Sequence, residues 1–323
     1  MTDNSLSEIT KGVSFFQPPP DRIAGWRRSA NIVMLDGNRE IFLIDTGGPS
    51  IRKQLVGIVR NQLEGPRDQI HCVHTHGHID HIAGTPVLKD HLSAESWAAE
   101  NAIPFVEKQS PIFFERERES IVVFLHELFT APSWFVRAAM RVTLGKTKPL
   151  DSVRNILDMP TLKETGFIPI SLPGHHAGHT GFLNKENGIL IGGDLIDPRH
   201  RMKPLLTAPS SDFQMMKESL EKLRGLGVTI LLPGHGNPIA GEEKVQAALD
   251  QALQTLSNAR EAVISILETL PTSLPDLSSQ LIRLGLGPGD VFRRMFIHCI
   301  LRHLMESGKV GKQQTRRKTV FSI

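Results

Sequence analysis

The chain has 323 residues, of which 40% are hydrophobic and 22% charged, enough for one large or two ordinary globular domains and unlike a disordered chain. The net charge is only +3, and the N-terminal segment lacks signal-peptide features, so we expect a soluble cytoplasmic protein with no membrane span. The two cysteines, Cys72 and Cys299, stand far apart and form no disulfide framework or zinc knuckle. Tyrosine is absent, which excludes any mechanism that needs a phenol.

The first half of the chain is typical of an α/β fold. Residues 31–35 and 40–44 are apolar runs joined through Asp36 and Gly37, which predicts a β-hairpin. Residues 51–63 predict a helix, and residues 69–74 predict a strand that leads into His76. Further strands are predicted over 167–172, 188–191 and 228–232, each ending at a glycine turn beside a His or Asp. Since open α/β folds carry their chemistry at strand ends, we expect a site where these turns meet.

Residues 93–159 differ from this pattern and predict a helical insertion rich in aromatic residues, among them Phe105 and Trp134. The stretch 121–144 is interrupted by charged residues and is too polar to cross a bilayer, so it must cover protein. Two interpretations stay open at this point. The insertion is either a helical layer or dimer contact, or a lid whose aromatic face forms one wall of a substrate pocket.

The sequence after residue 240 changes in character. A long helix is predicted over 245–267, then helices over 274–284 and 291–305 and a basic β-hairpin over 309–323, which gives a winged-helix-like outline. Residues 281–323 carry nine Lys or Arg against two acidic residues, a net +7 that leaves about −4 for the rest. We therefore predict a catalytic domain over 1–240 and a second domain over 241–323. The basic segment is a candidate RNA contact, and a solvated basic face is the simpler alternative.

Histidines concentrate in the segment from Thr75 to His81, which holds four candidate metal ligands within six residues. His76 and His78 can point to one metal ion, whereas Asp80 and His81 begin the next turn and can point to a second. Three later turns present further candidates after apolar strands: PGHHAGHT at 173–180, GGD at 192–194 and PGHG at 233–236. Four such motifs in order favour a metal site over unrelated structural histidines.

On these motifs the chain resembles the metallo-β-lactamase fold superfamily of hydrolases, in its branch with a C-terminal winged-helix-type domain. The resemblance implies an α/β fold, a four-layer αββα sandwich with a helical insertion and a small C-terminal winged-helix-like domain. It also implies two divalent metal ions, zinc before iron or manganese. The implied ligands are His76, His78 and His175 for the first ion, Asp80, His81 and His235 for the second, and Asp194 as the bridge.

The same resemblance assigns supporting positions around these ligands. Asp45 would support the ligand loop, and the PGH pattern favours His175 over the adjacent His176. His179 would then lie behind the ligands. We expect His71, His74 and His126 to be hydrogen-bonded structural residues, His298 and Cys299 to be core residues, and Trp26 to be a candidate for the edge of the cleft.

The implied chemistry is hydrolysis by a metal-bridging hydroxide that Asp80 and Asp194, the candidate catalytic residues, orient. His78 in place of Glu excludes the flavodiiron pattern, and the missing tyrosine disfavours the lactonase and glyoxalase II branches, whose pockets use that residue. Penicillin hydrolysis is disfavoured because true β-lactamases normally lack an Asp-His-His second site. The apolar insertion favours an ester or thioester of an apolar small molecule. An endoribonuclease and a nucleic-acid-binding regulator with a structural metal site remain alternatives.

Overall fold

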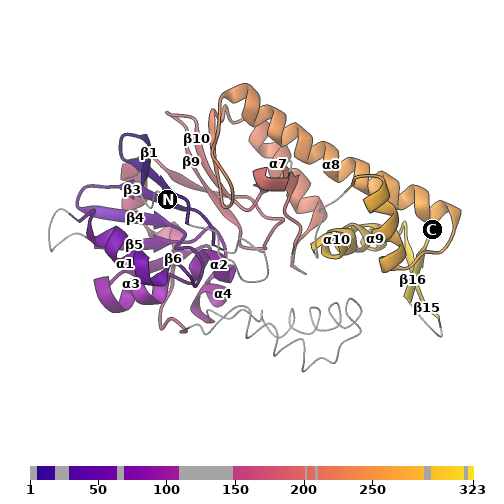
Figure 1. The fold of residues 1–323 in the computed structure, drawn as a ribbon, viewed down its shortest axis with the longest axis horizontal. Coiled ribbons are helices and arrows are strands. Elements are labelled where there is room, and N and C mark those ends of the chain that lie inside the picture. Colours follow the sequence, from indigo (N-terminus) through magenta and orange to yellow (C-terminus); the bar gives the residue numbers. More distant parts are fainter. Residues whose placement is uncertain are drawn as a thin grey trace.

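The computed structural model describes residues 6–18, 29–63, 69–108, 148–200, 202–207, 210–286, 292–315 and 319–323. Two β-sheets lie face to face in this part of the chain, and helices cover their outer sides (Figure 1). Trp26, His126 and the centre of the predicted insertion, 109–147, lie outside the described residues.

The first sheet contains seven strands that neighbour each other in chain order. They are β1 (Ser7–Thr10), β2 (Val13–Phe16), β3 (Ile32–Asp36), β4 (Glu40–Ile44), β5 (Gln69–Val73), β6 (Glu95–Ala98) and β7 (Arg154–Asn155). The pairs from β1 to β4 are antiparallel, so the predicted hairpin of β3 and β4 is confirmed. The pairs from β4 to β7 are parallel. Helix α1 (Arg52–Arg60) returns the chain from β4 to β5, and α3 (Thr85–Leu92) lies between β5 and β6.

The second sheet has five strands in the order β14-β13-β10-β9-β8. Their bounds are β8 (Ile168–Ser171), β9 (Thr180–Asn184), β10 (Ile189–Gly193), β13 (Ile230–Pro233) and β14 (Ile239–Ala240). Helix α7 (Phe213–Arg224) precedes β13, and α8 (Glu242–Thr269) follows β14. Between β10 and α7, a short ladder of β11 (Ile196–Asp197) and β12 (Lys203–Pro204) flanks the turn η3 (Pro198–His200).

Alternating side chains divide each sheet between two apolar layers. Phe42 of β4 packs between the sheets in the same cluster as Phe182 of β9, whereas the next residue, Leu43, packs on the opposite face with Leu55 of α1. Leu190 of β10 belongs to an outer cluster formed with α7 and α8. The layers therefore run helix, sheet, sheet, helix, which confirms the predicted four-layer α/β fold.

The directions of the strands bring the predicted motifs to one edge. Strands β8, β10 and β13 point the same way, because β9 is antiparallel to β8 and β10 while β13 is parallel to β10. In the first sheet, β4 and β5 are parallel neighbours. The turns that carry Asp45, the Thr75–His81 segment, His175, Asp194 and His235 each follow one of these five strands.

A helical insertion is predicted over residues 93–159. The described ends of this interval contain two strands as well as a helix. β6 and β7 are strands of the first sheet, and α4 (Ile103–Lys108) follows β6, with the short turns η1 (Ile156–Asp158) and η2 (Thr161–Thr165) after β7. β6 has four residues and β7 has two, which is too few to show a strand period, so the hydrophobic pattern did not separate them from a helix. The lid and the dimer contact remain predictions.

The C-terminal elements follow in the predicted order: α9 (Leu274–Arg283), α10 (Phe292–Glu306), β15 (Gly311–Gln314) and β16 (Thr319–Ser322). Helix α8 extends from the second sheet to these elements (Figure 1). One apolar cluster joins Leu190 and Leu231 of the second sheet with Leu277 of α9 and Leu301 of α10. A shared core therefore crosses the predicted domain boundary at residue 240, and the winged-helix-like domain stays a prediction. Among the described helices, none is long and apolar enough to cross a membrane.

Candidate metal centre

The loop after β5 places two histidines within reach of each other. It enters the short helix α2 (Ile79–Ile82), whose first turn is closed by the N–H of His81 donating to the carbonyl of His78 at 3.0 Å. Gly77 allows close packing on α4, since a Cβ there would lie 2.3 Å from the Cβ of Phe105. The turn leaves Nε2 of His76 only 2.9 Å from Nδ1 of His78.

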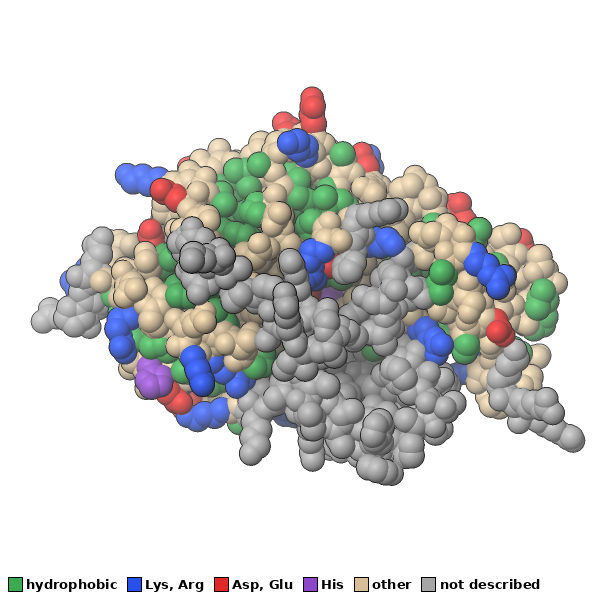
Figure 2. Space-filling model, viewed as in Figure 1, with side chains coloured by type: hydrophobic (Ala, Val, Ile, Leu, Met, Phe, Trp, Pro, Cys, Tyr) green, Lys and Arg blue, Asp and Glu red, His purple; other side chains and the backbone are tan. Residues whose placement is uncertain are grey.

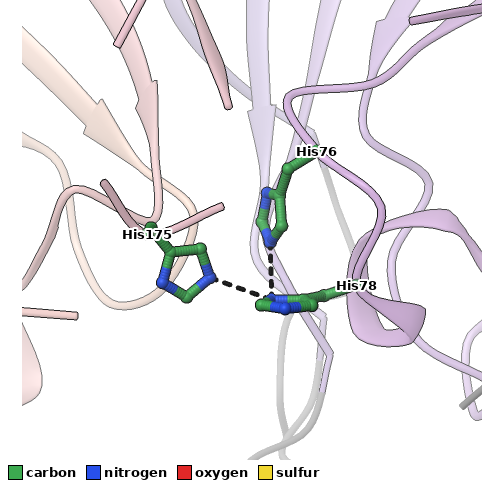
Figure 3. Close-up of side chains that lie close together, drawn as sticks. All are labelled: His76, His78 and His175. Atoms are coloured by element: carbon green, nitrogen blue, oxygen red, sulfur yellow. Dashed lines mark hydrogen bonds between the residues drawn. The ribbon is translucent and has the colours of Figure 1, made fainter. Parts of the chain in front are cut away.

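A third imidazole reaches this pair from the second sheet. Nε2 of His175 also lies 2.9 Å from Nδ1 of His78, so three ring nitrogens converge (Figure 3). Nδ1 of His175 donates to the carbonyl of Leu205 at 2.6 Å, which leaves the lone pair on Nε2 facing the others. A neutral imidazole has a single N–H, so without a cation the Nδ1–H of His78 would have to be shared between the lone pairs of His76 and His175. A cation at their meeting point would use every free lone pair.

The second group of side chains surrounds Asp194. Nε2 of His235 lies 3.3 Å from Oδ2 of Asp80 and 3.6 Å from Oδ2 of Asp194. On the other oxygen of Asp194, Oδ1 lies 3.3 Å from Nε2 of His81. Oδ2 of Asp194 is also 3.5 Å from Nε2 of His175, which belongs to the first group. Asp194 therefore lies between the two groups, and all seven predicted ligands come together.

Burial and charge make this donor set suitable for a divalent cation. Nε2 of His81 and Oδ1 of Asp194 are buried and have no hydrogen-bond partner within the described part of the chain. Burial, followed by the charge of nearby histidines, lowers the pKa of His76 well below its usual value, so its ring is neutral. Burial alone would raise the pKa of Asp194, but the positive charge of His235 and His81 lowers it overall. Neutral imidazoles and ionised carboxylates are the ligands of a divalent metal site.

Asp45 supports the centre from the end of β4. Its Oδ1 accepts the N–H of Thr75 at 2.9 Å, and its Oδ2 accepts the Thr75 hydroxyl at 2.8 Å and Nδ1–H of His81 at 2.7 Å. This last bond turns Nε2 of His81 toward Asp194. Burial would lower the pKa of His81, but the charges of Asp194 and Asp45 raise it well above its usual value. Metal binding at Nε2 would therefore release a proton.

The three histidines of the 173–180 motif have three different environments. His175 joins the convergent nitrogens, as described above. His179 uses both ring nitrogens: Nδ1 donates to the carbonyl of Leu172 at 3.0 Å, and Nε2 accepts the backbone N–H of Asp194 at 3.0 Å. His176 accepts the N–H of Gly178 at 3.2 Å, and its ring meets Phe105 edge-on with centroids 4.4 Å apart. His179 thus positions Asp194, and His176 packs beside the centre.

The other described histidines and cysteines considered from the sequence are not part of the two ligand groups. Nε2 of His74 lies 3.2 Å from the hydroxyls of both Ser96 and Thr85, and Nδ1 of His71 accepts Nε1–H of Trp97 at 3.2 Å. Burial raises the pKa of the Cys72 and Cys299 thiols to about 12. Neither cysteine supplies a thiolate at neutral pH.

Sequence analysis missed two residues next to His235. Nδ2 of Asn31 donates to the carbonyls of Pro233 and Gly236 at 2.9 Å each, which holds the turn that carries His235. Arg199 and His235 line one small cavity of about 20 Å³. Figure 2 shows a histidine side chain in a recess near the middle of one face, next to acidic and basic side chains. The only sequence signal for Arg199 was its place five residues after Asp194.

This fold and this side-chain cluster define a metal-dependent hydrolase. The model of the metallo-beta-lactamase superfamily matches residues 25–235, so the chain belongs to that superfamily.

Several known proteins are similar to the chain. A probable metallo-hydrolase, YqjP of Bacillus subtilis, is 26% identical over 77% of this chain and 80% of its own length. The hydroxyacylglutathione hydrolase GloC of Haemophilus influenzae is 24% identical over 65% of this chain and 86% of its own length. Among solved structures, the metallo-beta-lactamase family protein TTHA1429 of Thermus thermophilus has a TM-score of 0.74 at 20% identity and covers 98% of this chain and 99% of its own. That likeness concerns the fold alone.

Proposed function

We propose that the chain is a dinuclear metal-dependent hydrolase that cleaves an ester or thioester carbonyl of a small molecule. The observation that carries this proposal is the position of Asp194. Its Oδ2 faces His175 of one group at 3.5 Å and His235 of the other at 3.6 Å. A carboxylate between two sets of imidazoles is the arrangement that a pair of metal ions requires.

The ligand assignment follows the two groups. The first ion would be held by His76, His78 and His175 and the second by Asp80, His81 and His235, and Asp194, which lies between the two groups, would be the shared ligand. Asp45 and His179 are positioning residues, because they act through His81 and Asp194 respectively. Zinc is the expected metal, since imidazole and carboxylate ligands suit it.

The ions, when bound, supply a water molecule of lowered pKa and positive charge for the carbonyl oxygen. The chain's own contribution is orientation. Burial would raise the pKa of Asp80, but the hydrogen bond and charge of His235 and the charge of His81 lower it overall. Asp80 and Asp194 are therefore both ionised at neutral pH, and each would accept a hydrogen bond from a water molecule held at the centre. No nucleophile from the protein is needed.

Two observations favour a carbonyl substrate over RNA. The half-buried Phe105 lies next to Gly77 of the ligand loop and against the ring of His176, which places an apolar side chain beside the centre and suits an acyl group better than a phosphodiester. One relative, GloC, is named as a hydroxyacylglutathione hydrolase, and the bond in such a substrate is a thioester.

The test compares the zinc-loaded protein with its Asp194→Asn variant on thioesters, esters, penicillin and single-stranded RNA. Asp250→Asn is the matched control, because Asp250 forms a surface ion pair with Arg224 at 2.9 Å. We expect about two zinc ions per chain in the wild type. Thioester hydrolysis should fall by at least about 10³-fold in Asp194→Asn, by the loss of a metal ligand, and persist in Asp250→Asn.

If the protein cleaved RNA but no thioester, the substrate class would be a phosphodiester and the proposed carbonyl substrate would be wrong. A chain that takes up no transition metal would overturn the proposal altogether. If Asp194→Asn retained both metal ions and full activity, the bridging assignment would be wrong.

A further inference from the structure

The turn that carries His175 is held through its backbone by the start of α7. Its position depends on three hydrogen bonds to consecutive carbonyls: the Ser219 hydroxyl donates to Pro173 at 2.6 Å, the N–H of Asp212 to Gly174 at 2.7 Å, and the Ser211 hydroxyl to His175 at 2.8 Å. A Cβ on Gly174 would lie 2.4 Å from the backbone nitrogen of Met216 in α7, so the turn packs directly on that helix. The location of His175 therefore follows the location of Ser211 and Asp212.

Helix α10 of the C-terminal part of the chain holds Ser211 and Asp212 in turn. Nη2 of Arg302 donates to the carbonyl oxygen of Ser211, and the thiol of Cys299 donates to the same oxygen at 3.4 Å. The guanidinium of Arg302 also lies 3.9 Å from the carboxylate of Asp212. A continuous path of hydrogen bonds thus joins α10 to the backbone of a candidate metal ligand.

Arg302 is the stronger of the two donors to this carbonyl. Ser211 is fully buried, so its carbonyl oxygen depends on donors from the protein. A thiol is a weak donor, whereas a guanidinium forms a charge-assisted hydrogen bond. Without the guanidinium, the buried carbonyl would retain only the weak bond from Cys299, and the segment would lose its firm attachment to α10.

We propose that Arg302 is a positioning residue for His175 and acts through Ser211, which makes α10 a part of the candidate metal centre. This inference rests on the proposed function, because it concerns the first ion of that same site. Nε2 of His175 lies 2.9 Å from Nδ1 of His78, and a shift of the turn would separate these two ligand atoms. The turns that carry Asp80, His81 and His235 are not part of this path, so the effect should be confined to the first ion.

The test measures zinc affinity of the full chain by competition with a chromophoric chelator. Arg302→Met keeps the apolar stem of the side chain and removes its donors. We expect one of the two zinc ions to bind about 10-fold more weakly, as for residues that act behind a metal ligand, and the other to keep its affinity. Arg302→Lys should restore most of the loss, because an ammonium still donates to a carbonyl. Equal weakening of both ions in Arg302→Met would mean a general distortion and would overturn the proposal.

A double-mutant cycle tests the path itself. Ser211→Ala removes the hydroxyl that donates to the carbonyl of His175 and should also weaken one ion about 10-fold. If Arg302 acts through Ser211, the chain with both Arg302→Met and Ser211→Ala loses about as much affinity as Ser211→Ala alone. Losses that multiply would show that the two residues act independently, and the path would be wrong.

Two control variants separate positioning from general stability. Glu306→Gln removes another carboxylate near Arg302, at 3.8 Å and 63% exposed, and should leave zinc affinity unchanged. Leu277→Ala removes a fully buried side chain of α9 from the apolar core, so it should lower the stability measured by urea unfolding and keep the zinc affinity. If Leu277→Ala weakened zinc binding as much as Arg302→Met, the C-terminal helices would only stabilise the fold and Arg302 would have no positioning role.

Amide hydrogen exchange of the chelator-treated chain separates this inference from the proposed function. The N–H of Asp212 donates to the Gly174 carbonyl, so its exchange rate reports whether the segment stays on the turn. We expect exchange at Asp212 to be at least about 10-fold faster in Arg302→Met than in the wild type or Glu306→Gln. If the chain bound no zinc but this difference were present, the proposed function would be wrong and the role of Arg302 in placing the turn would stand. If thioesters were hydrolysed and neither exchange nor zinc affinity changed in Arg302→Met, the role of Arg302 would be wrong and the proposed function would stand.

Discussion

Oδ2 of Asp45 lies 2.7 Å from Nδ1 of His81, and this bond determines which nitrogen of His81 faces the candidate metal centre. The carboxylate also accepts both polar hydrogens of Thr75, so its lone pairs serve three donors. The φ of Asp45 is 61°, in the left-handed region that Asp and Asn tolerate better than most residues. Position 45 therefore needs a residue that tolerates a positive φ and also carries a carboxylate that reaches Thr75 and His81.

Asp45→Asn keeps the size and the backbone preference of this residue but removes its charge. An amide presents an NH₂ group where two oxygens are needed, so His81 loses its orientation. We expect zinc affinity at the site of His81 to fall about 10- to 100-fold. Competition with a chromophoric chelator measures this, and near-ultraviolet circular dichroism checks that the fold is retained. Asp250→Asn is the control, and unchanged zinc affinity in Asp45→Asn would contradict the role given to Asp45.

Gly234 lets the turn before His235 approach Asp194 closely. A Cβ on Gly234 would lie 2.3 Å from Oδ1 of Asp194 and 2.9 Å from Cε1 of His81. Gly234→Ala should therefore cost about 1–3 kcal/mol of folding free energy by overpacking and lower the zinc content. Gly57→Ala is the matched change, because Gly57 lies within α1 with nothing within 4 Å of the added Cβ. It should raise stability by about 0.5–1 kcal/mol.

Urea unfolding and metal analysis of these two variants are the measurements. If Gly234→Ala bound zinc as tightly as the wild type, the close approach of this turn to Asp194 would be irrelevant to the site.

His298 of α10, which is not among the candidate ligands, makes stability depend on pH. Burial, followed by the charges of Arg302 and Lys312, lowers its pKa to about 4. The ring is then neutral in the folded chain, whereas the unfolded chain takes up a proton below about pH 6.5. Between these values the unfolded state binds more protons at this position, so stability falls as the pH falls. The contribution approaches about 1.4 kcal/mol per pH unit, the value for one proton.

His298→Gln should remove this contribution to the pH dependence of the free energy of unfolding. The measurement is urea unfolding of chelator-treated wild type and variant between about pH 4.5 and 7.5, a window that spans most of the interval between the two pKa values. The other buried histidines are present in both chains, so their contributions cancel in the difference. Parallel stability curves for the two chains would show that His298 does not titrate as stated.

Much of the fold could be predicted from the sequence because the signals are local. The apolar runs of β3 and β4 with the Asp36-Gly37 turn and the helical period of α8 depend only on neighbouring residues, and all three elements are where the sequence predicts them. β1, β2 and β9 were missed, because short strands without strong turn signals resemble loops. β6 was included in a helical interval because its four residues are too few to show a period.

The sequence alone determined the set of candidate ligands, since a glycine turn with a His or Asp after an apolar strand is a local pattern. Only the tertiary structure decided which donors face one another. His175 and His176 are adjacent and chemically identical, and their environments differ because the turn after β8 directs one ring to His78 and the other to Phe105. Only the tertiary structure placed Arg199 as well, because its neighbours in the sequence form no motif. Its place beside His235 arises because β10 and β13 are parallel and end at one edge, a long-range pairing that no local pattern encodes.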